Sequence, residues 1–90
     1  MQTRDAIRTT LIELMEADTG ETYGNLEDDK NLRTELGLDS VDVVSIVSQV
    51  ERRFRIRLSQ QDLEKLVTIG DVLDLLELKL REAEAAPKAA

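Results

Sequence analysis

Three helix starts marked by the same kind of residue pair constrain the fold of this chain more than any other feature. In each pair, a residue able to cap a helix N-terminus is followed three positions later by aspartate. This arrangement satisfies free backbone N–H groups and places negative charge beside the positive end of the helix dipole. The pairs are Asp39 with Asp42, Ser59 with Asp62, and Thr68 with Asp71. Aspartate is a weaker third residue than glutamate, but three pairs within 33 residues predict three helices.

Apolar residues recur at helical spacing after each of these starts and once before them. We expect helices over residues 4–16, 40–53, 60–66 and 69–83. Valine is a poor helix former, yet the apolar positions 43, 47, 50 and 54 of the second segment follow the helical period. The four segments predict an all-α fold, a small four-helix bundle with a long first loop and a short third helix.

Two connecting segments are expected to lack regular structure. Residues 17–39 form the long first loop, and loops of this length are usually functional or held in place by packed residues. The residues expected to hold it are Leu26, Leu32, Leu36 and Leu38. Residues 54–58 alternate as a strand does, but a lone strand has no partner, so we expect an extended loop. Its inward side chains would be Phe54, Ile56 and Leu58.

The length of 90 residues suits one small core. We expect a single domain over residues 1–83 and a flexible, alanine-rich tail over residues 84–90. Because no apolar stretch exceeds two residues, the sequence contains neither a membrane-spanning helix nor the core of a signal peptide. We therefore expect a cytoplasmic protein with no membrane partner.

The missing residue types exclude several kinds of chemistry. The chain has no cysteine and no histidine, which removes the thiolate nucleophile, the commonest general base and the commonest zinc ligands. Its net charge of −7 repels nucleic acid and favours partners with basic patches. We expect a monomer that is not an enzyme, with no catalytic residues, no metal site and no nucleic-acid partner.

Ser40 is the residue best placed to carry chemistry. If Asp39 caps the second helix, Ser40 becomes the first helical residue and its hydroxyl is free of capping. A phosphate attached there would lie where the helix dipole and free N–H groups favour an anion. Gly37 would supply the tight turn into the helix. An Asp-Ser pair before an apolar run is, however, usually only a helix cap.

The residues around this pair carry a more specific signal. From about Leu32 to Leu80 the chain resembles the acyl carrier protein family, the phosphopantetheine-dependent carriers of fatty-acid and polyketide synthesis. The matching stretches are LGLDSVD at 36–42, ERRFRIRL at 51–58, SQQDLEKL at 59–66 and TIGDVLDLL at 68–76. The first helix is similar to the family only in position and amphipathic character.

The resemblance implies a cofactor and a mechanism. The resemblance assigns Ser40 and Asp39 to the cofactor site. In the family, the serine at the position of Ser40 is esterified to 4′-phosphopantetheine from coenzyme A by a separate phosphopantetheinyl transferase. The thiol of the arm then carries acyl groups as thioesters to an acyltransferase, a ketosynthase or other acyl-processing enzymes. A chain without cysteine would in this way obtain its sulfur from a cofactor.

The resemblance also implies roles for other residues of the second helix. The positions that match partner-binding residues of the family are Val41, Asp42, Val44, Glu51, Arg52 and Arg53. Those that match acyl-chain-lining residues are Val47, Val50, Phe54 and Leu58. The simpler interpretations are a solvated, capped helix face for the first set and ordinary core for the second.

The chain departs from the family pattern in its charges. Ser45 stands where a glutamate is often found, and four arginines against one glutamate give residues 51–57 a local charge of +3. Cations suit the C-terminal end of a helix dipole, but charge patterning also sets partner choice. We therefore expect a polyketide or another specialised pathway rather than housekeeping fatty-acid synthesis.

Two other functions stay open and two are rejected. A peptidyl carrier of nonribosomal peptide synthesis would share the arm, whereas an unmodified acidic interaction module would not need the serine hydroxyl. A calcium loop beginning at Asp18 fails because Tyr23 occupies the position that requires glycine. A hydrolase built on Ser40 lacks a histidine base and a glycine-rich nucleophile elbow.

Overall fold

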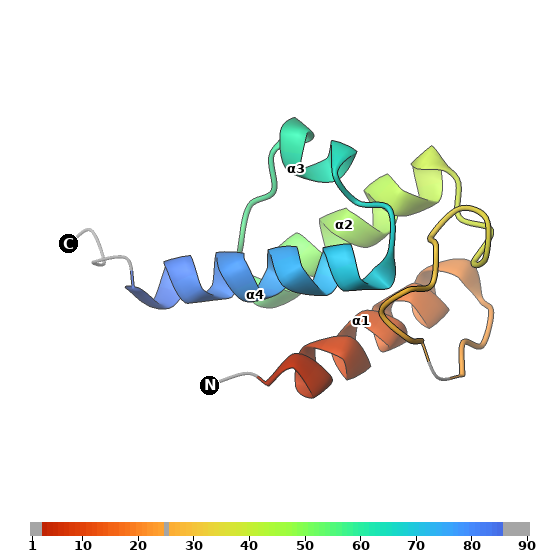
Figure 1. Ribbon diagram of the computed structural model, residues 1–90, viewed down its shortest axis with the longest axis horizontal. Coiled ribbons are helices and arrows are strands. Elements are labelled where there is room, and N and C mark those ends of the chain that lie inside the picture. The colour runs from red at the N-terminus through yellow and green to blue at the C-terminus, as the bar shows by residue number, and fades with distance from the viewer. Residues whose placement is uncertain (1–2, 25, 86–90) are drawn as a thin grey trace.

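The computed structural model describes residues 3–24 and 26–85. In this part of the chain the fold is all-α, as predicted, and consists of four helices (Figure 1). The helices are α1 (Arg4–Thr19), α2 (Ser40–Phe54), α3 (Gln60–Glu64) and α4 (Ile69–Ala85). Among the described residues, no helix is both long enough and apolar enough to cross a membrane.

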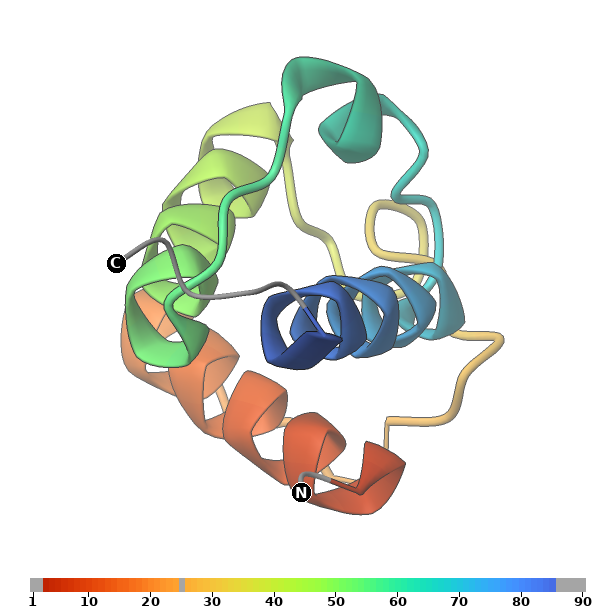
Figure 2. The same ribbon diagram turned by 90° about the vertical axis from the view of Figure 1, so that its left-hand side faces the viewer.

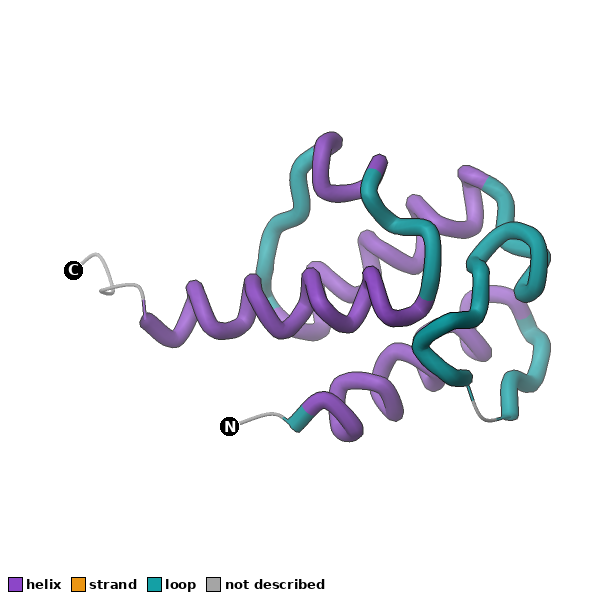
Figure 3. Tube along the Cα trace, viewed as in Figure 1, coloured by secondary structure: helices purple, strands orange, loops and turns teal. Residues whose placement is uncertain are grey.

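Helix α1 packs against both α2 and α4. Helix α1 runs in the opposite direction to α2 and α4 (Figures 1 and 2). The short α3 lies in the connection from α2 to α4. The tube view shows that the long first loop closes the end of the bundle where α1 ends and α2 begins (Figure 3). The first turn of α1 and the last turn of α4 lie toward the other end. Ser40, the first residue of α2, therefore lies far from both.

The core is built almost entirely from aliphatic side chains contributed by the helices and the first loop. Ile69, Leu73 and Leu76 of α4 have no exposed surface, which makes α4 the centre of the bundle. Figure 2 shows the other three helices arranged around it. The remaining buried residues are Ile7, Leu11, Met15, Leu26, Leu32, Leu38, Ile46, Val47, Val50, Phe54 and Ile56.

All three predicted capping pairs form. The side chains of Asp39 and Asp42, and those of Ser59 and Asp62, cap each other's backbone N–H groups in reciprocal capping boxes. The Asp71 carboxylate likewise accepts from the Thr68 N–H at 3.0 Å, and the Thr68 hydroxyl accepts from the Asp71 N–H at 3.2 Å. The helix starts were therefore predicted correctly.

The helix ends differ more from the prediction. Helix α1 continues to Thr19, because the first residue with a left-handed backbone is Gly20, whose N–H closes the helix on the Glu16 carbonyl. Helix α3 ends two residues earlier than expected and α4 two residues later. Residues 86–90 of the expected flexible tail lie outside the described residues.

Residues 54–58 do not form the continuous extended loop that was expected. Phe54 is still helical, and Arg55 adopts a left-handed conformation at φ 58° that ends α2 by bonding its N–H to the Glu51 carbonyl. The expected inward orientation is nevertheless present, since Phe54 and Ile56 are buried and Leu58 packs on the core half-buried.

The first loop is held by more than the expected leucines. Leu26, Leu32 and Leu38 are buried and Leu36 is half-buried, as predicted. In addition, backbone hydrogen bonds join the loop to Val67 and to the first two residues of α4. The Leu32 N–H donates to the Val67 carbonyl at 2.9 Å, the Ile69 N–H to Lys30 at 3.0 Å and the Gly70 N–H to Asp28 at 2.8 Å.

A charged cluster fastens the same loop to the beginning of α1. Arg4 of α1 forms ion pairs with Asp28 of the loop at 2.8 Å, with Asp74 of α4 at 2.8 Å and with Glu77 of α4. Arg8 pairs with Asp28 at 2.5 Å. The two guanidinium groups, Arg4 foremost, lower the pKa of the Asp28 carboxyl below its usual value.

Candidate functional site

The Ser40 side chain is exposed at the first residue of α2. Capping is performed by its neighbour, since the Asp39 carboxylate accepts from the Asp42 N–H at 2.8 Å and Asp42 accepts from the Asp39 N–H at 3.3 Å. Within the described part of the chain, the Ser40 hydroxyl has no hydrogen-bond partner. The Ser40 hydroxyl is thus accessible from solvent and takes no part in capping the helix.

The turn before α2 fixes the direction in which Ser40 points. Gly37 has φ 71°, a left-handed conformation that is unstrained only without a side chain. Leu38 then turns into the core, and its N–H donates to the Leu32 carbonyl at 2.9 Å. Val43, one helical turn further on, also packs against the core. With the residues on both sides anchored inward, Ser40 faces solvent.

The surface beside Ser40 combines two aspartates with exposed valines. Asp39 and Asp42 place their carboxylates at the positive end of the helix, where they are favourable. Val41 is 75% exposed and Val44 is 54% exposed, which is unusual for β-branched apolar side chains on a helix of this bundle. Four residues assigned by sequence to the cofactor or to partners therefore surround Ser40 on one exposed helix start.

The remaining sequence-assigned partner residues lie at the far end of α2. Arg52 and Arg53 are exposed in its last turn. Glu51 is half-buried, and its carboxylate accepts from the Leu58 N–H at 2.8 Å, so it holds the segment after the helix. Its position near the arginines was visible in the sequence, but its bond to Leu58 was not.

A polar contact between α1 and α2 was missed by sequence reasoning. Asp18, in the last turn of α1, accepts from the Ser45 hydroxyl at 2.5 Å and from the Gln49 side-chain amide at 2.7 Å. Ser45, which stands where the family often has glutamate, is therefore used to join two helices. The carboxylate that contacts Ser45 and Gln49 therefore comes from α1. No local sequence signal indicates a contact between residues so far apart.

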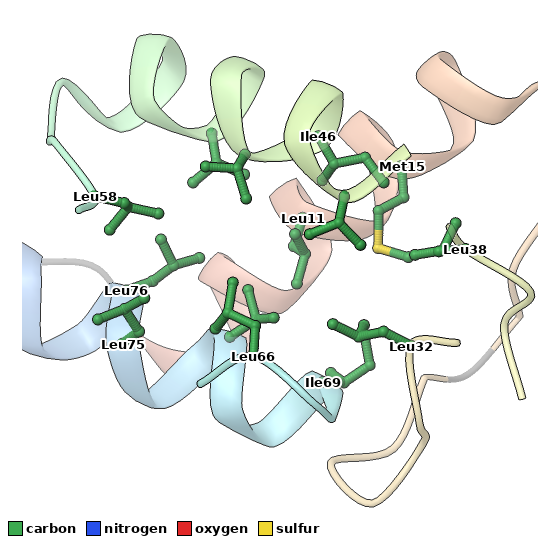
Figure 4. A pocket seen from close by; sticks show the side chains of 14 residues that line it. Leu11, Met15, Leu32, Leu38, Ile46, Leu58, Leu66, Ile69, Leu75 and Leu76 are labelled. Atoms are coloured by element: carbon green, nitrogen blue, oxygen red, sulfur yellow. The ribbon is translucent and has the colours of Figure 1, made fainter. Parts of the chain in front are cut away.

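An apolar cavity lies inside the helix bundle (Figure 4). Its walls come from α1, α2, α4 and the connecting segments. Three of the four residues assigned to an acyl chain, Val47, Val50 and Leu58, line it. Phe54 is buried in the core but is not among the lining residues. The others are Leu11, Met15, Leu32, Leu38, Val43, Ile46, Leu66, Ile69, Val72, Leu75 and Leu76.

The cavity is small, with a volume of about 30 Å³. By this measure one water molecule needs roughly 10–15 Å³. Its walls expose no polar surface, so the space favours apolar matter over water.

Residues 5–76, most of the chain, match the family model described as a phosphopantetheine attachment site. The fold and the site thus define a carrier domain, a protein that bears a covalently attached prosthetic arm.

Curated and solved relatives narrow this class. An acyl carrier protein from an Exiguobacterium species is 32% identical over 78 residues, spanning 87% of this chain and 99% of the relative. The crystal structure of an acyl carrier protein from Thermotoga maritima superposes with a TM-score of 0.83 at 25% identity, covering 89% of this chain and 93% of that one. The acetyl actinorhodin acyl carrier protein of Streptomyces coelicolor superposes with a TM-score of 0.65 at 25% identity, covering 91% and 94%. The chain belongs to the acyl carrier protein family.

Membership of this family determines the general chemistry. Acyl carrier proteins are carriers and not catalysts, and they carry a covalent 4′-phosphopantetheine. They act together with synthase and transferase enzymes. The thiol that the sequence lacks is supplied by this group when it is bound.

Proposed function

We propose that Ser40 is the residue that bears the 4′-phosphopantetheine and that the chain carries acyl intermediates in a polyketide or another specialised pathway. The observation that carries this proposal is the exposed Ser40 hydroxyl, which leaves helix capping to Asp39. The neighbouring aspartates and exposed valines would face the enzymes that load and unload the arm.

The attachment proceeds as a group transfer on a separate transferase. The Ser40 oxygen forms a bond to the phosphorus of the pantetheine phosphate of coenzyme A. The pyrophosphate bond breaks, and 3′,5′-adenosine diphosphate leaves. The hydroxyl proton passes to a base of the transferase. The part of this chain is to present the hydroxyl, and the helix N-terminus favours the phosphodiester charge that results.

The choice of a specialised pathway is supported by two observations. One solved relative is the acyl carrier protein of actinorhodin, with acetyl bound. The other is the charge pattern of α2, whose C-terminal end carries exposed arginines instead of a continuous acidic face. A peptidyl carrier is the alternative, and its cargo would be aminoacyl rather than acyl.

Intact mass spectrometry tests the attachment. The purified protein is incubated with coenzyme A, Mg²⁺ and a broad-specificity phosphopantetheinyl transferase. We expect a mass gain of one phosphopantetheinyl group, which is lost in Ser40→Ala and kept in the matched variants Ser48→Ala and Ser59→Ala. Failure of the native chain to gain this mass with several transferases would contradict the proposal.

A second experiment tests the cargo. The loaded protein is offered malonyl-CoA with a malonyltransferase, or an amino acid and ATP with an adenylation domain. The proposal expects a malonyl or other acyl adduct on the loaded protein and none on Ser40→Ala. Charging with an aminoacyl group alone would favour the peptidyl carrier instead.

A further inference from the structure

A surface hollow lies beside the last turns of α2. It is lined by Ser48, Glu51, Arg52, Ile56 and Arg57. The side chains of Ser48, Arg52 and Arg57 are exposed, and all three can donate hydrogen bonds. We call this feature the arginine hollow. Its donors suit a ligand group that is negatively charged and accepts hydrogen bonds.

The two guanidinium groups of the arginine hollow are not neutralised within the fold. Among the described residues, no carboxylate forms an ion pair with Arg52 or Arg57, whereas both arginines of α1 have such partners. The carboxylate of Glu51 is half-buried and already accepts from a backbone N–H at 2.8 Å. Residues 51–57 carry a net charge of +3, which exceeds the partial charge of about −0.5 at the end of a helix dipole. The hollow therefore attracts anions.

The Ser48 hydroxyl is also unused by the fold. Hydroxyl groups inside helices commonly donate to the carbonyl one turn back, as those of Thr9, Thr10 and Thr19 do in α1. The Ser45 hydroxyl of α2 instead donates to a carboxylate of α1. In the part of the chain that the structure describes, Ser48 makes neither kind of bond, so its hydroxyl is free to donate to a ligand.

A single row of exposed residues connects the arginine hollow with the attachment serine. Ser40, Val44, Ser48 and Arg52 follow one another at intervals of four, which places them along one ridge of the helix surface. All four are exposed. Along the helix axis, Ser48 lies about 12 Å and Arg52 about 18 Å from Ser40. A flexible group attached to Ser40 can therefore follow this ridge to the hollow.

A phosphopantetheine arm on Ser40 has a length that matches this path. From the serine oxygen to the thiol sulfur it runs through about 14 bonds, and an extended chain advances roughly 1.1–1.2 Å per bond, which gives about 16 Å. A short acyl group that ends in a carboxylate adds about 3.5 Å, so the carboxylate can lie about 20 Å from the serine oxygen. The end of such a cargo, and not its thioester, would then meet the arginines.

We propose that the arginine hollow holds the free carboxylate of a carboxyacyl group carried on the arm at Ser40. Arg52 and Arg57 pair with this carboxylate, and the Ser48 hydroxyl donates a hydrogen bond to it. The inference rests on the proposed function and adds to it a class of cargo, an acyl thioester with a terminal carboxylate. Guanidinium groups bind carboxylates well, and tethering raises the effective concentration of the cargo at the hollow. Because the contact is exposed to solvent, it is weak enough for an enzyme to withdraw the cargo.

NMR on the ¹⁵N-labelled full chain tests the proposal. A broad-specificity transferase loads the chain from malonyl-CoA or from acetoacetyl-CoA, whose acyl group has an uncharged methyl ketone in place of the carboxylate. We expect the Ser48 amide signal and the side-chain Nε–H signals of Arg52 and Arg57 to differ between the two loaded forms. The side-chain signal of Arg53, which is exposed on α2 but does not line the hollow, should be the same in both. A concentration of 1 M NaCl should reduce the differences, because the contact is an exposed ion pair.

Two variants separate the hollow from the general charge of the helix end. Arg52→Gln/Arg57→Gln should lower the docked population about threefold, and the Ser48 amide difference with it. Arg53→Gln removes a charge from the same last turn and should leave that difference unchanged. Because Arg52 and Arg57 are exposed and lack ion pairs among the described residues, the double variant should keep its melting temperature to within about 4 °C.

Several results would overturn the inference. One is equal signals from the malonyl and acetoacetyl forms at Ser48, Arg52 and Arg57. Another is a difference that survives in Arg52→Gln/Arg57→Gln, or that Arg53→Gln removes to the same extent. Free malonate, added to the unloaded protein at the concentration of the protein, should shift none of these signals. If it shifts them as far as the tethered malonyl group does, the hollow is a general anion site and not a cargo site.

Failure of this inference is distinguishable from failure of the proposed function. A chain that gains no phosphopantetheinyl mass would contradict both. A chain that is loaded at Ser40, but whose arginine hollow gives the same signals with either cargo, would contradict this inference alone.

Discussion

Replacing either of two adjacent residues, Asp39 or Ser40, should separate the folding role of the α2 start from its chemical role. The Asp39 carboxylate accepts from the Asp42 N–H at 2.8 Å, whereas the exposed Ser40 hydroxyl bonds to nothing in the described part of the chain. Asp39→Ala therefore removes a cap and a charge from the helix N-terminus. Ser40→Ala removes a group without a structural bond and introduces a better helix former.

The expected magnitudes differ clearly. Loss of an N-cap costs about 1 kcal/mol, and loss of the carboxylate beside the helix dipole adds about 0.5 kcal/mol. For a domain of this length, about 1.5 kcal/mol lowers the melting temperature by roughly 6–12 °C. Ser40→Ala should change the free energy of unfolding by less than about 0.5 kcal/mol, in either direction.

Urea denaturation followed by far-ultraviolet circular dichroism measures both effects on the unloaded protein. Ser59→Ala is the matched control, because Ser59 is a capping serine whose hydroxyl accepts from the Asp62 N–H at 3.1 Å. It should lower stability, whereas Ser40→Ala should not. If Ser40→Ala were as destabilising as Asp39→Ala, the hydroxyl would be part of the fold, and the argument that it is held free for modification would be refuted.

Three further predictions concern the scaffold. Leu76 has no exposed surface, so Leu76→Ala should lower the free energy of unfolding, measured by urea denaturation, by about 2–5 kcal/mol. Leu78 on the same helix is 48% exposed, so Leu78→Ala should lower it by less than about 0.5 kcal/mol. Equal losses would contradict the assigned core. Gly37→Ala should lower stability by about 1 kcal/mol, because φ at this residue is 71°, and an unchanged denaturation midpoint would show that the turn adapts. The pKa of Asp28 is lowered from about 3.8, so its pairing with Arg4 stabilises the fold above that pH and ceases to do so as the pH falls through the folded-state pKa. Asp28→Asn should therefore be less stable than the native chain at pH 7 and approach it as the pH falls through the lowered pKa of Asp28, and a stability gap independent of pH would contradict this role.

The features predicted correctly from the sequence are those fixed by local chemistry. A capping pair such as Asp39 and Asp42 spans three residues, so the helix start and the freedom of Ser40 can be inferred without knowledge of the fold. The end of α1 was predicted three residues too early, because the polar residues before Gly20 gave no sign that the helix continues to Thr19. The end of α2 was less visible, because an arginine occupies the left-handed position where glycine is usual.

The features that were missed depend on packing between distant segments. Asp18 meets Ser45 and Gln49 only because α1 and α2 lie side by side, and nothing in either segment alone indicates this contact. The backbone bonds between Lys30 and Ile69 likewise require the first loop to fold over the start of α4. The cavity walls combine α1, α2 and α4, so the sequence indicated only those lining residues that lie on or just after α2.

The positions of the helix termini have a consequence for how such a domain is used. Arg4 and Ala85 lie toward one end of the bundle, and the start of α2 lies at the other (Figure 1). A polypeptide extension fused before α1 or after α4 would leave the molecule on the side away from the serine. If Ser40 bears the arm as proposed, further domains joined to either terminus would leave the start of α2 accessible to other enzymes.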